Sequence, residues 1–114
     1  MGSGKPIREF LYVEDAAEGI VRATERYDDI SPLNIGTGIG TSILELVHKI
    51  IHVVQYPGEP VWNSDKPDGQ YKKIFDITKM KRVLDWGTQM PLIGGLRRTC
   101  DWFRDNYKEA IKRY

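Results

Sequence analysis

Arg8 is the residue whose surroundings point most clearly to chemistry. It follows Pro6, whose ring fixes the local backbone, and it precedes a run of β-branched and aromatic residues at strand spacing over 10–13. A guanidinium held between a proline turn and a strand can donate two parallel hydrogen bonds to a phosphate or a carboxylate. The sequence therefore predicts a local anion site at Arg8.

A polar loop over residues 63–71 is the second place where chemistry could occur. It carries Lys66 and Asp68, and Lys73 follows shortly after it. On composition alone, lysines beside a single aspartate favour a solvated surface. The alternative is a ligand-binding loop, because ammonium groups donate hydrogen bonds to phosphate and a carboxylate accepts them from hydroxyls.

Two further patterns are typical of cofactor or metal sites, but each is incomplete. The stretch Gly36–Gly40 follows a predicted strand, yet its Gly-x-Gly-x-Gly spacing favours a turn with positive φ over a dinucleotide-binding loop. Glu45, His48 and His52 share a helix face at a spacing that can ligate a metal. Because no HExxH motif or Cys/His cluster completes that set, we expect a solvated face. We expect neither a cofactor nor a metal in this chain.

Composition limits the classes of partner. The 114 residues include 17 Lys and Arg against 16 Asp and Glu, so the net charge of +1 provides no general attraction to nucleic acid or to an anionic membrane. The single cysteine, Cys100, cannot form an internal disulfide and fits a reducing compartment. No apolar run reaches the roughly 18 residues of a membrane span. We expect a cytoplasmic protein with neither nucleic-acid nor membrane partners.

Hydrophobic spacing predicts helices that position the candidate residues. The first should begin at a capping box formed by Asp15 and Glu18. A second should run from Ile43 to about Gln55, capped by Ser42. The inward stripe of the first helix consists of Ala16, Ala17, Ile20, Val21 and Thr24.

Two more helices are expected in the second half of the chain. Asp76 should cap a helix that runs to about Asp85 and stops at Gly87. Pro91 should open the last helix. The apolar stripe of that helix is predicted to be core and consists of Leu92, Leu96, Cys100, Phe103 and Tyr107.

Short strands complete the predicted fold. They are expected at Phe10–Val13, Leu33–Ile35 and Glu59–Trp62. Together the elements predict a mixed α/β fold, a small domain of about four helices and three to four short strands over residues 1–114.

Three stretches resemble the extended short-chain dehydrogenase/reductases that act on nucleotide sugars. The first reads Arg-Glu-Phe-Leu-Tyr-Val-Glu-Asp-Ala-Ala over 8–17, and the second covers 33–38 together with Thr41-Ser42. The third, Lys-Pro-Asp-Gly over 66–69 followed by Lys72-Lys73, resembles the GDP-L-fucose synthase version in particular. The stretches occur in the family's order, and the resemblance covers nearly all of this chain but only about the last third of a family member.

The resemblance implies a nucleotide-sugar-binding substrate domain in which Arg8, Lys66, Asp68 and Lys73 face a GDP-sugar. It also implies that the N-terminal Rossmann domain, which holds NADP in the full-length family, is absent here. The family's catalytic Tyr-x-x-x-Lys pair does not occur in the sequence. We therefore expect this chain alone to be inactive and to form a homo-oligomer through surface that the Rossmann domain would cover. The alternative is a non-catalytic interaction or assembly module that keeps the fold without binding ligand.

Overall fold

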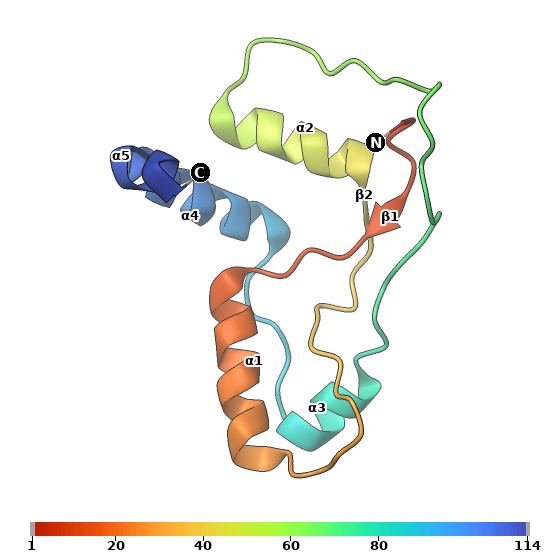
Figure 1. The fold of residues 1–114 in the computed structure, drawn as a ribbon, viewed down its shortest axis with the longest axis vertical. Coiled ribbons are helices and arrows are strands. Elements are labelled where there is room, and N and C mark those ends of the chain that lie inside the picture. The colour runs from red at the N-terminus through yellow and green to blue at the C-terminus, as the bar shows by residue number, and fades with distance from the viewer. Residues whose placement is uncertain (1, 114) are drawn as a thin grey trace.

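The computed structural model describes residues 2–113 and confirms a mixed α/β fold (Figure 1). Five α-helices, a single 3₁₀ turn and two short strands are found in that part of the chain. Their bounds, in chain order, are β1 (Ile7–Arg8), α1 (Val13–Arg26), β2 (Thr41–Ser42), α2 (Ile43–Val54), α3 (Thr78–Leu84), α4 (Leu92–Asp105), α5 (Tyr107–Ala110) and η1 (Ile111–Arg113).

The helices pack as two pairs that long extended segments connect. Helix α1 packs against α3 in the lower part of Figure 1, and α2 packs against α4 in the upper part. We call these pairs, with the segments packed on them, the α1–α3 half and the α2–α4 half. The two-residue strands pair antiparallel, with Ile7 opposite Ser42 and Arg8 opposite Thr41.

The strands do not lie where the sequence predicted them. Phe10–Val13, Leu33–Ile35 and Glu59–Trp62 form no strand in the described chain, and β1 lies earlier, at Ile7–Arg8. β-propensity marks a residue that suits a pleated surface, but a strand also requires a neighbouring backbone to pair with. Among residues 2–113, the paired backbone is found beside Ile7 and not beside these three segments.

The predicted capping box of the first helix is wrong. Helix α1 begins at Val13, with Tyr12 at the N-cap and no side-chain cap, so Asp15 lies inside the first turn. The buried carboxylate of Asp15 instead accepts hydrogen bonds from the backbone amides of Gln89 (3.1 Å) and Met90 (2.9 Å). Asp15 therefore fixes the segment before α4 to the start of α1.

The predicted inward stripe of α1 is also wrong. Ile20 and Val21 are 60% and 52% exposed. The face that packs contains Gly19, where a Cβ would lie 2.8 Å from the Ile35 side chain and 3.0 Å from the Trp86 ring. The absence of a side chain lets α1 approach these two residues, and the contact rotates the larger apolar residues outward.

A small core forms where α3 meets α1. Met80 and Leu84 are fully buried, and Trp86 closes the cluster. The predicted cap at Asp76 is wrong, because Ile77 is the N-cap residue and has no side-chain cap; Asp76 Oδ1, one residue earlier, accepts hydrogen bonds from Thr78 N (2.9 Å) and Thr78 Oγ1 (2.7 Å) at the first residue of α3. The helix ends one turn earlier than Gly87, at Leu84. Asp85 takes the left-handed conformation there, with φ of 47°.

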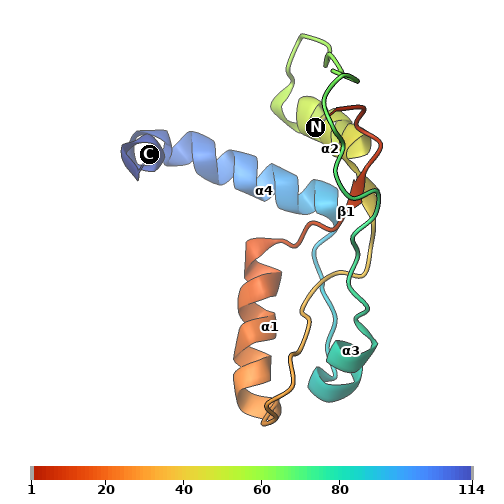
Figure 2. The ribbon, with the colours of Figure 1, turned by 45° about the vertical axis from the view of Figure 1, so that its right-hand side comes forward.

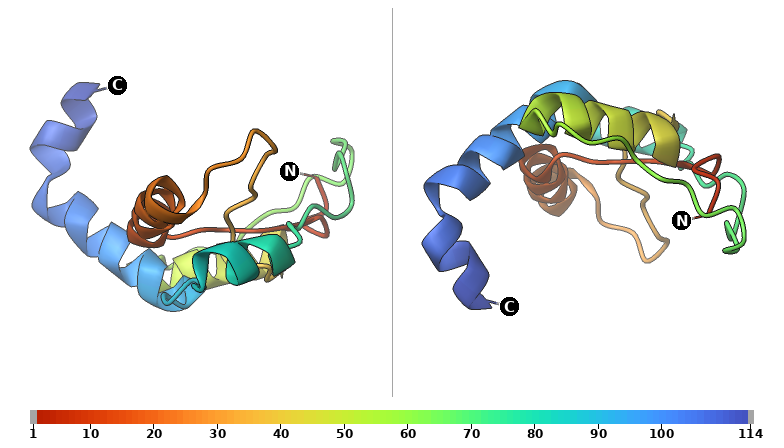
Figure 3. Two further views of the ribbon diagram at one scale, coloured as in Figure 1. Left: turned by 90° about the horizontal axis from the view of Figure 1, so that it is seen from below. Right: turned by 90° about the horizontal axis from the view of Figure 1, so that it is seen from above.

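The α2–α4 half begins as predicted but is more open. Ser42 Oγ accepts a hydrogen bond from Glu45 N (3.1 Å), which confirms it as the α2 cap, and Pro91 precedes α4. The aromatic stripe predicted as core is only partly covered, because Phe103 and Tyr107 are exposed and pack edge to face on one another at 5.5 Å. Figures 2 and 3 show the C-terminal end of α4, together with α5, extending away from the remaining elements.

The resulting shape is open for a chain of this size. The accessible surface is 8500 Å², whereas a compact monomer of this mass exposes about 6,400 Å². The radius of gyration is 16.7 Å, against about 13 Å for a compact domain of similar length. Within residues 2–113, no helix combines the length and apolar character needed to cross a membrane.

Candidate functional site

Arg8 lies inside β1, and Ile7 beside it is paired on both edges. On one edge is β2. On the other, Ile7 N donates to Tyr71 O (2.8 Å) and Lys73 N donates to Ile7 O (3.0 Å), which forms a parallel bridge with Lys72. Backbone pairing thereby brings Lys73, at the end of the polar loop, next to Arg8.

Arg8 and Lys73 line the same hollow, whose volume is about 230 Å³. Glu9 and Phe75 supply the rest of its lining, and we call it the Arg8–Lys73 hollow. Arg8 Nη1 donates to the carbonyl oxygen of Ile7 (2.8 Å), so the guanidinium is folded back on its own strand. Its other N–H groups and the exposed Lys73 ammonium can both donate to an anion at this place.

Asp68 does not line this hollow but fastens the loop to the start of the chain. Its carboxylate accepts hydrogen bonds from Ser3 N (2.7 Å) and Ser3 Oγ (2.6 Å). The bond from the Ser3 hydroxyl, and then the bond from the Ser3 amide, lower the pKa of Asp68 below its usual value. Lys66, two residues earlier, is exposed and its amide donates to Asn63 O (3.1 Å).

Glu9 belongs to this site, although it was not among the residues predicted from the sequence. Glu9 Oε1 accepts from Thr37 N (2.7 Å), and Glu9 Oε2 accepts from Phe75 N (3.0 Å). A charged residue directly after Arg8 was the available signal, but its partners are 28 and 66 positions away. No local pattern could have identified them.

The glycine turn packs against this site. A Cβ at Gly36 would collide with Glu9 Oε1, and Gly38 has φ of 71°, a conformation that disfavours other residues. The turn borders a second hollow of about 610 Å³, whose lining includes Lys81 and Thr88.

His48 and His52 are exposed. Among the described residues, no three His, Cys, Asp or Glu side chains gather as a metal site.

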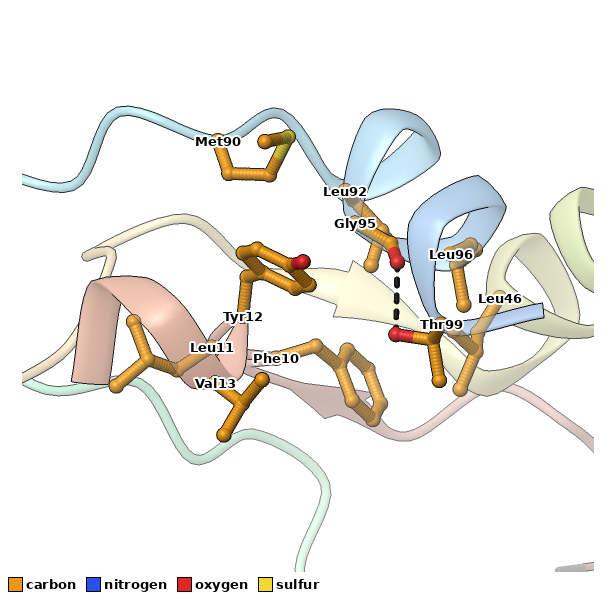
Figure 4. Close-up of a pocket in the computed structure, with 10 residues that line it drawn as sticks. All are labelled: Phe10, Leu11, Tyr12, Val13, Leu46, Met90, Leu92, Gly95, Leu96 and Thr99. Carbon is orange, nitrogen blue, oxygen red and sulfur yellow. Dashed lines mark hydrogen bonds between the residues drawn. The ribbon is translucent and has the colours of Figure 1, made fainter. Parts of the chain in front are cut away.

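The pocket in Figure 4 differs chemically from the Arg8–Lys73 hollow. It has a volume of about 270 Å³ and lies among the segment before α1, α2 and the start of α4. The lining is almost wholly apolar, and its Thr99 hydroxyl already donates to Gly95 O (2.8 Å). Such a pocket can bury an apolar group. It offers no charged groups to an anion, so we retain the Arg8–Lys73 hollow as the candidate site.

Comparisons with known proteins agree with the resemblance seen in the sequence. Residues 1–36 match the model of the NAD dependent epimerase/dehydratase family. The chain is 36% identical over 111 residues to "Probable GDP-L-fucose synthase 1" of Oryza sativa subsp. japonica, a match that covers 97% of this chain and 34% of that protein.

Solved structures show the same similarity. A GDP-L-fucose synthetase from Naegleria fowleri bound to NADP superposes with a TM-score of 0.88 at 31% identity, covering 94% of this chain and 34% of that one. A UDP-glucose 4-epimerase from Thermotoga maritima, solved with UDP-glucose, gives 0.84 at 33% identity, with coverage of 94% and 34%. The chain thus spans about a third of the length of these relatives.

These matches define the class of protein. The fold is that of a segment of the nucleotide-sugar epimerases and reductases in the NAD dependent epimerase/dehydratase family. Within that class, the chain is similar over nearly its whole length to GDP-L-fucose synthases. The resemblance identified from the sequence is confirmed.

Proposed function

We propose that this chain binds a GDP-sugar, as the substrate-binding part of a nucleotide-sugar epimerase or reductase of the GDP-L-fucose synthase type. One observation carries the proposal, namely that Arg8 and Lys73 line a common hollow although they are 65 positions apart (73 − 8). A diphosphate carries adjacent negative charges, and a guanidinium beside an ammonium complements them.

The role proposed for each residue follows from its donors and acceptors. Arg8 grips the diphosphate, and Lys73 adds charge from the other wall of the hollow. Lys66 adds charge from the exposed loop over 63–71. Asp68 holds that loop in place through Ser3, or turns to accept hydrogen bonds from hydroxyls of the ligand. The proposed location is the cytoplasm, where the lone Cys100 would stay reduced.

Titration with nucleotides tests the proposal. We expect GDP and GDP-mannose to shift the amide resonances of Arg8, Lys73 and Phe75 in ¹H–¹⁵N spectra, with dissociation constants on the order of 0.1 to 1 mM. UDP-glucose, a nucleotide sugar with another base, measures selectivity for the base. An absence of shifts with several millimolar GDP-mannose would remove the binding proposal.

Catalysis by this chain alone is not part of the proposal. The Tyr-x-x-x-Lys pair of the family is missing from the sequence, and the glycine turn packs against Glu9. We expect the chain neither to bind NADPH nor to oxidise it in the presence of a nucleotide sugar. Micromolar NADPH affinity, measured by the change in nicotinamide fluorescence, would overturn this expectation.

A second candidate function is assembly, and the open shape favours it. The accessible surface of 8500 Å² exceeds that of a compact monomer by about 2,100 Å². An excess of that size is larger than the roughly 800 Å² that each partner buries in a stable interface of standard size. If the function is assembly, the apolar faces of α1 and of the α2–α4 half pack against those of a second copy of the chain. Sedimentation equilibrium tests it, because a clean monomer at high micromolar concentration would exclude self-association as the function.

A further inference from the structure

We propose that Glu9 is the positioning residue of the anion site, and that it holds Lys73 and Arg8 at the separation that a diphosphate requires. This inference rests on the proposed function, but its structural part can be tested without ligand. Glu9 lies in the stretch over 8–17 that carries the resemblance, but the resemblance assigns it no role in binding. Its carboxylate connects three segments: the end of β1, the glycine turn at Thr37 and the segment ending at Phe75.

The parallel pairing beside β1 joins Ile7 to the segment that contains Lys73. Ile7 lies between Tyr71 and Lys73 in the hydrogen-bond pattern. In a regular parallel ladder, the residue two positions on would lie between Lys73 and Phe75, and its carbonyl would accept from the Phe75 amide. Here the Glu9 carboxylate accepts from Phe75 N instead, at 3.0 Å. The side chain thus extends the ladder beyond its last backbone bond.

The other carboxylate oxygen of Glu9 contacts the glycine turn. Glu9 Oε1 accepts from Thr37 N at 2.7 Å, and the buried Gly36 leaves room for it, since a Cβ there would collide with that oxygen. The carboxylate is therefore confined on both sides. Hydrogen bonds to an ionised acceptor are about twice as strong as neutral ones, so both contacts restrain the backbone beside Lys73.

The bonds of Glu9 act on residues that line the hollow. Lys73 and Phe75 lie on the same short segment, and both line the hollow with Arg8 and Glu9. Within residues 2–113, a single backbone hydrogen bond, from Lys73 N to Ile7 O, holds Lys73 to β1 directly. If the Phe75 contact is lost, the end of this segment is free to move away from Arg8, and the ammonium is no longer fixed beside the guanidinium.

Two variants break the carboxylate contacts from opposite sides. Glu9→Gln keeps the shape of the side chain. Its NH₂ group, however, then faces one of the two backbone N–H donors and cannot accept a hydrogen bond from it. Gly36→Ala leaves Glu9 intact and displaces its oxygen. Both should move the amide proton resonances of Thr37 and Phe75 upfield in the ligand-free chain. Glu18→Gln, on the exposed face of α1 where Glu18 pairs with Arg22, is the matched control and should leave both resonances in place.

Pyrophosphate binding then separates positioning from a merely structural role. We expect Glu9→Gln to weaken binding about tenfold, a loss of one misplaced cation contact. The same substitution in a Lys73→Ala background should have almost no further effect, because no ammonium is left to position. A tenfold loss that persists in that background would overturn the proposal, since it would reflect general loss of structure.

Failure of the proposed function gives a different pattern. If the wild-type chain does not bind pyrophosphate but the Thr37 and Phe75 resonances respond to Glu9→Gln and Gly36→Ala, the diphosphate grip is wrong and the contacts of Glu9 are right. If those resonances do not respond, the positioning role of Glu9 is wrong whether or not pyrophosphate binds.

Discussion

The two halves of the molecule are built from similar amphipathic helices but bury very different amounts of them. In the α1–α3 half, Met80 and Leu84 are fully buried, with Trp86 and the Leu33–Ile35 segment closing the cluster. In the α2–α4 half, none of the α2 residues, all of which the structure describes, is fully buried. The difference lies in what covers each pair of helices. Trp86 and Ile35 complete a closed core on the first pair, whereas the segment before α1 contacts the start of α4 in the second pair and leaves an open apolar pocket.

The comparison teaches what helical periodicity measures. An apolar stripe indicates that a helix has a face to bury, but it does not identify what covers that face. The exposed Ile20, Val21 and Phe103 all lie on predicted inward stripes. Each marks surface that remains available to another protein surface.

Truncation of a large apolar side chain should give the largest difference in stability loss between the two halves. Leu84→Ala removes a fully buried side chain and should lower the free energy of unfolding by about 2 to 5 kcal/mol. Phe103→Ala, in the open half, should cost clearly less because nearly half of that side chain is exposed. Urea denaturation of both variants checks the difference. Equal losses would contradict the contrast between the halves.

Adding a methyl group at a helical glycine tests the same contrast from the opposite direction. Gly19→Ala places a Cβ against Ile35 and Trp86, and overpacking of this kind costs about 1 to 3 kcal/mol. Gly94→Ala in α4 meets chiefly the flexible Met90 sulfur, so the helix propensity of alanine should offset the contact. A melting temperature lowered by both substitutions alike would show that the two halves are equally close-packed.

A smaller effect is expected where Lys79 fastens the loop after α1. Lys79 Nζ donates to Tyr27 OH (2.7 Å), Ser31 Oγ (2.9 Å) and the carbonyl of Pro32 (3.1 Å). The bond from Lys79, followed by the one to Ser31, lowers the pKa of Tyr27. Lys79→Met should therefore raise the pKa of Tyr27, which ¹³C resonances of labelled tyrosine measure. An unchanged pKa would mean that this contact does not form in solution.

The smallest effect is expected on the stability of the chain at acid pH. The pKa of Asp68 is lowered by Ser3, so the stabilisation from this contact is complete above the ordinary value of 3.8 and disappears as the pH falls through the lower folded value. Ser3→Ala should move the Asp68 titration back toward 3.8. Asp76, whose pKa is lowered by Thr78 in the α1–α3 half, is the internal control and should not move. A shift of Asp76 of the same size would indicate general loosening.

Local signals in the sequence predicted the parts of the fold that depend on neighbouring residues. Ser42 caps α2 through its side chain, and Pro91 lies directly before α4, next to the first helical position that proline favours. The role of Asp15 was predicted wrongly because its carboxylate accepts hydrogen bonds from backbone amides 74 and 75 positions away. The three predicted strands failed for the same reason, since strand pairing is a nonlocal property.

The residues of the candidate site also differ in whether the sequence could identify them. Arg8 could be selected from the sequence because its flanking residues are informative, and the resemblance added Lys73, which the structure brings to the same hollow. Glu9 could not be selected, because Thr37 and Phe75 become its partners only after folding. Lys66 and Asp68 keep the roles proposed above as predictions.

The measurement that tests the proposed function most directly is GDP-mannose binding to the Arg8→Ala variant, followed by ¹H–¹⁵N spectra. Loss of a bidentate charged contact should cost about 2 to 4 kcal/mol of binding free energy, and Arg8→Lys should recover little of it because the fork geometry is gone. Arg22→Ala, which removes a half-buried α1 guanidinium paired with Glu18, is the control. We predict that the shifts around Arg8 and Lys73 vanish in Arg8→Ala and persist in Arg22→Ala. Undiminished binding by Arg8→Ala would contradict the assignment of the Arg8–Lys73 hollow as the nucleotide-sugar site.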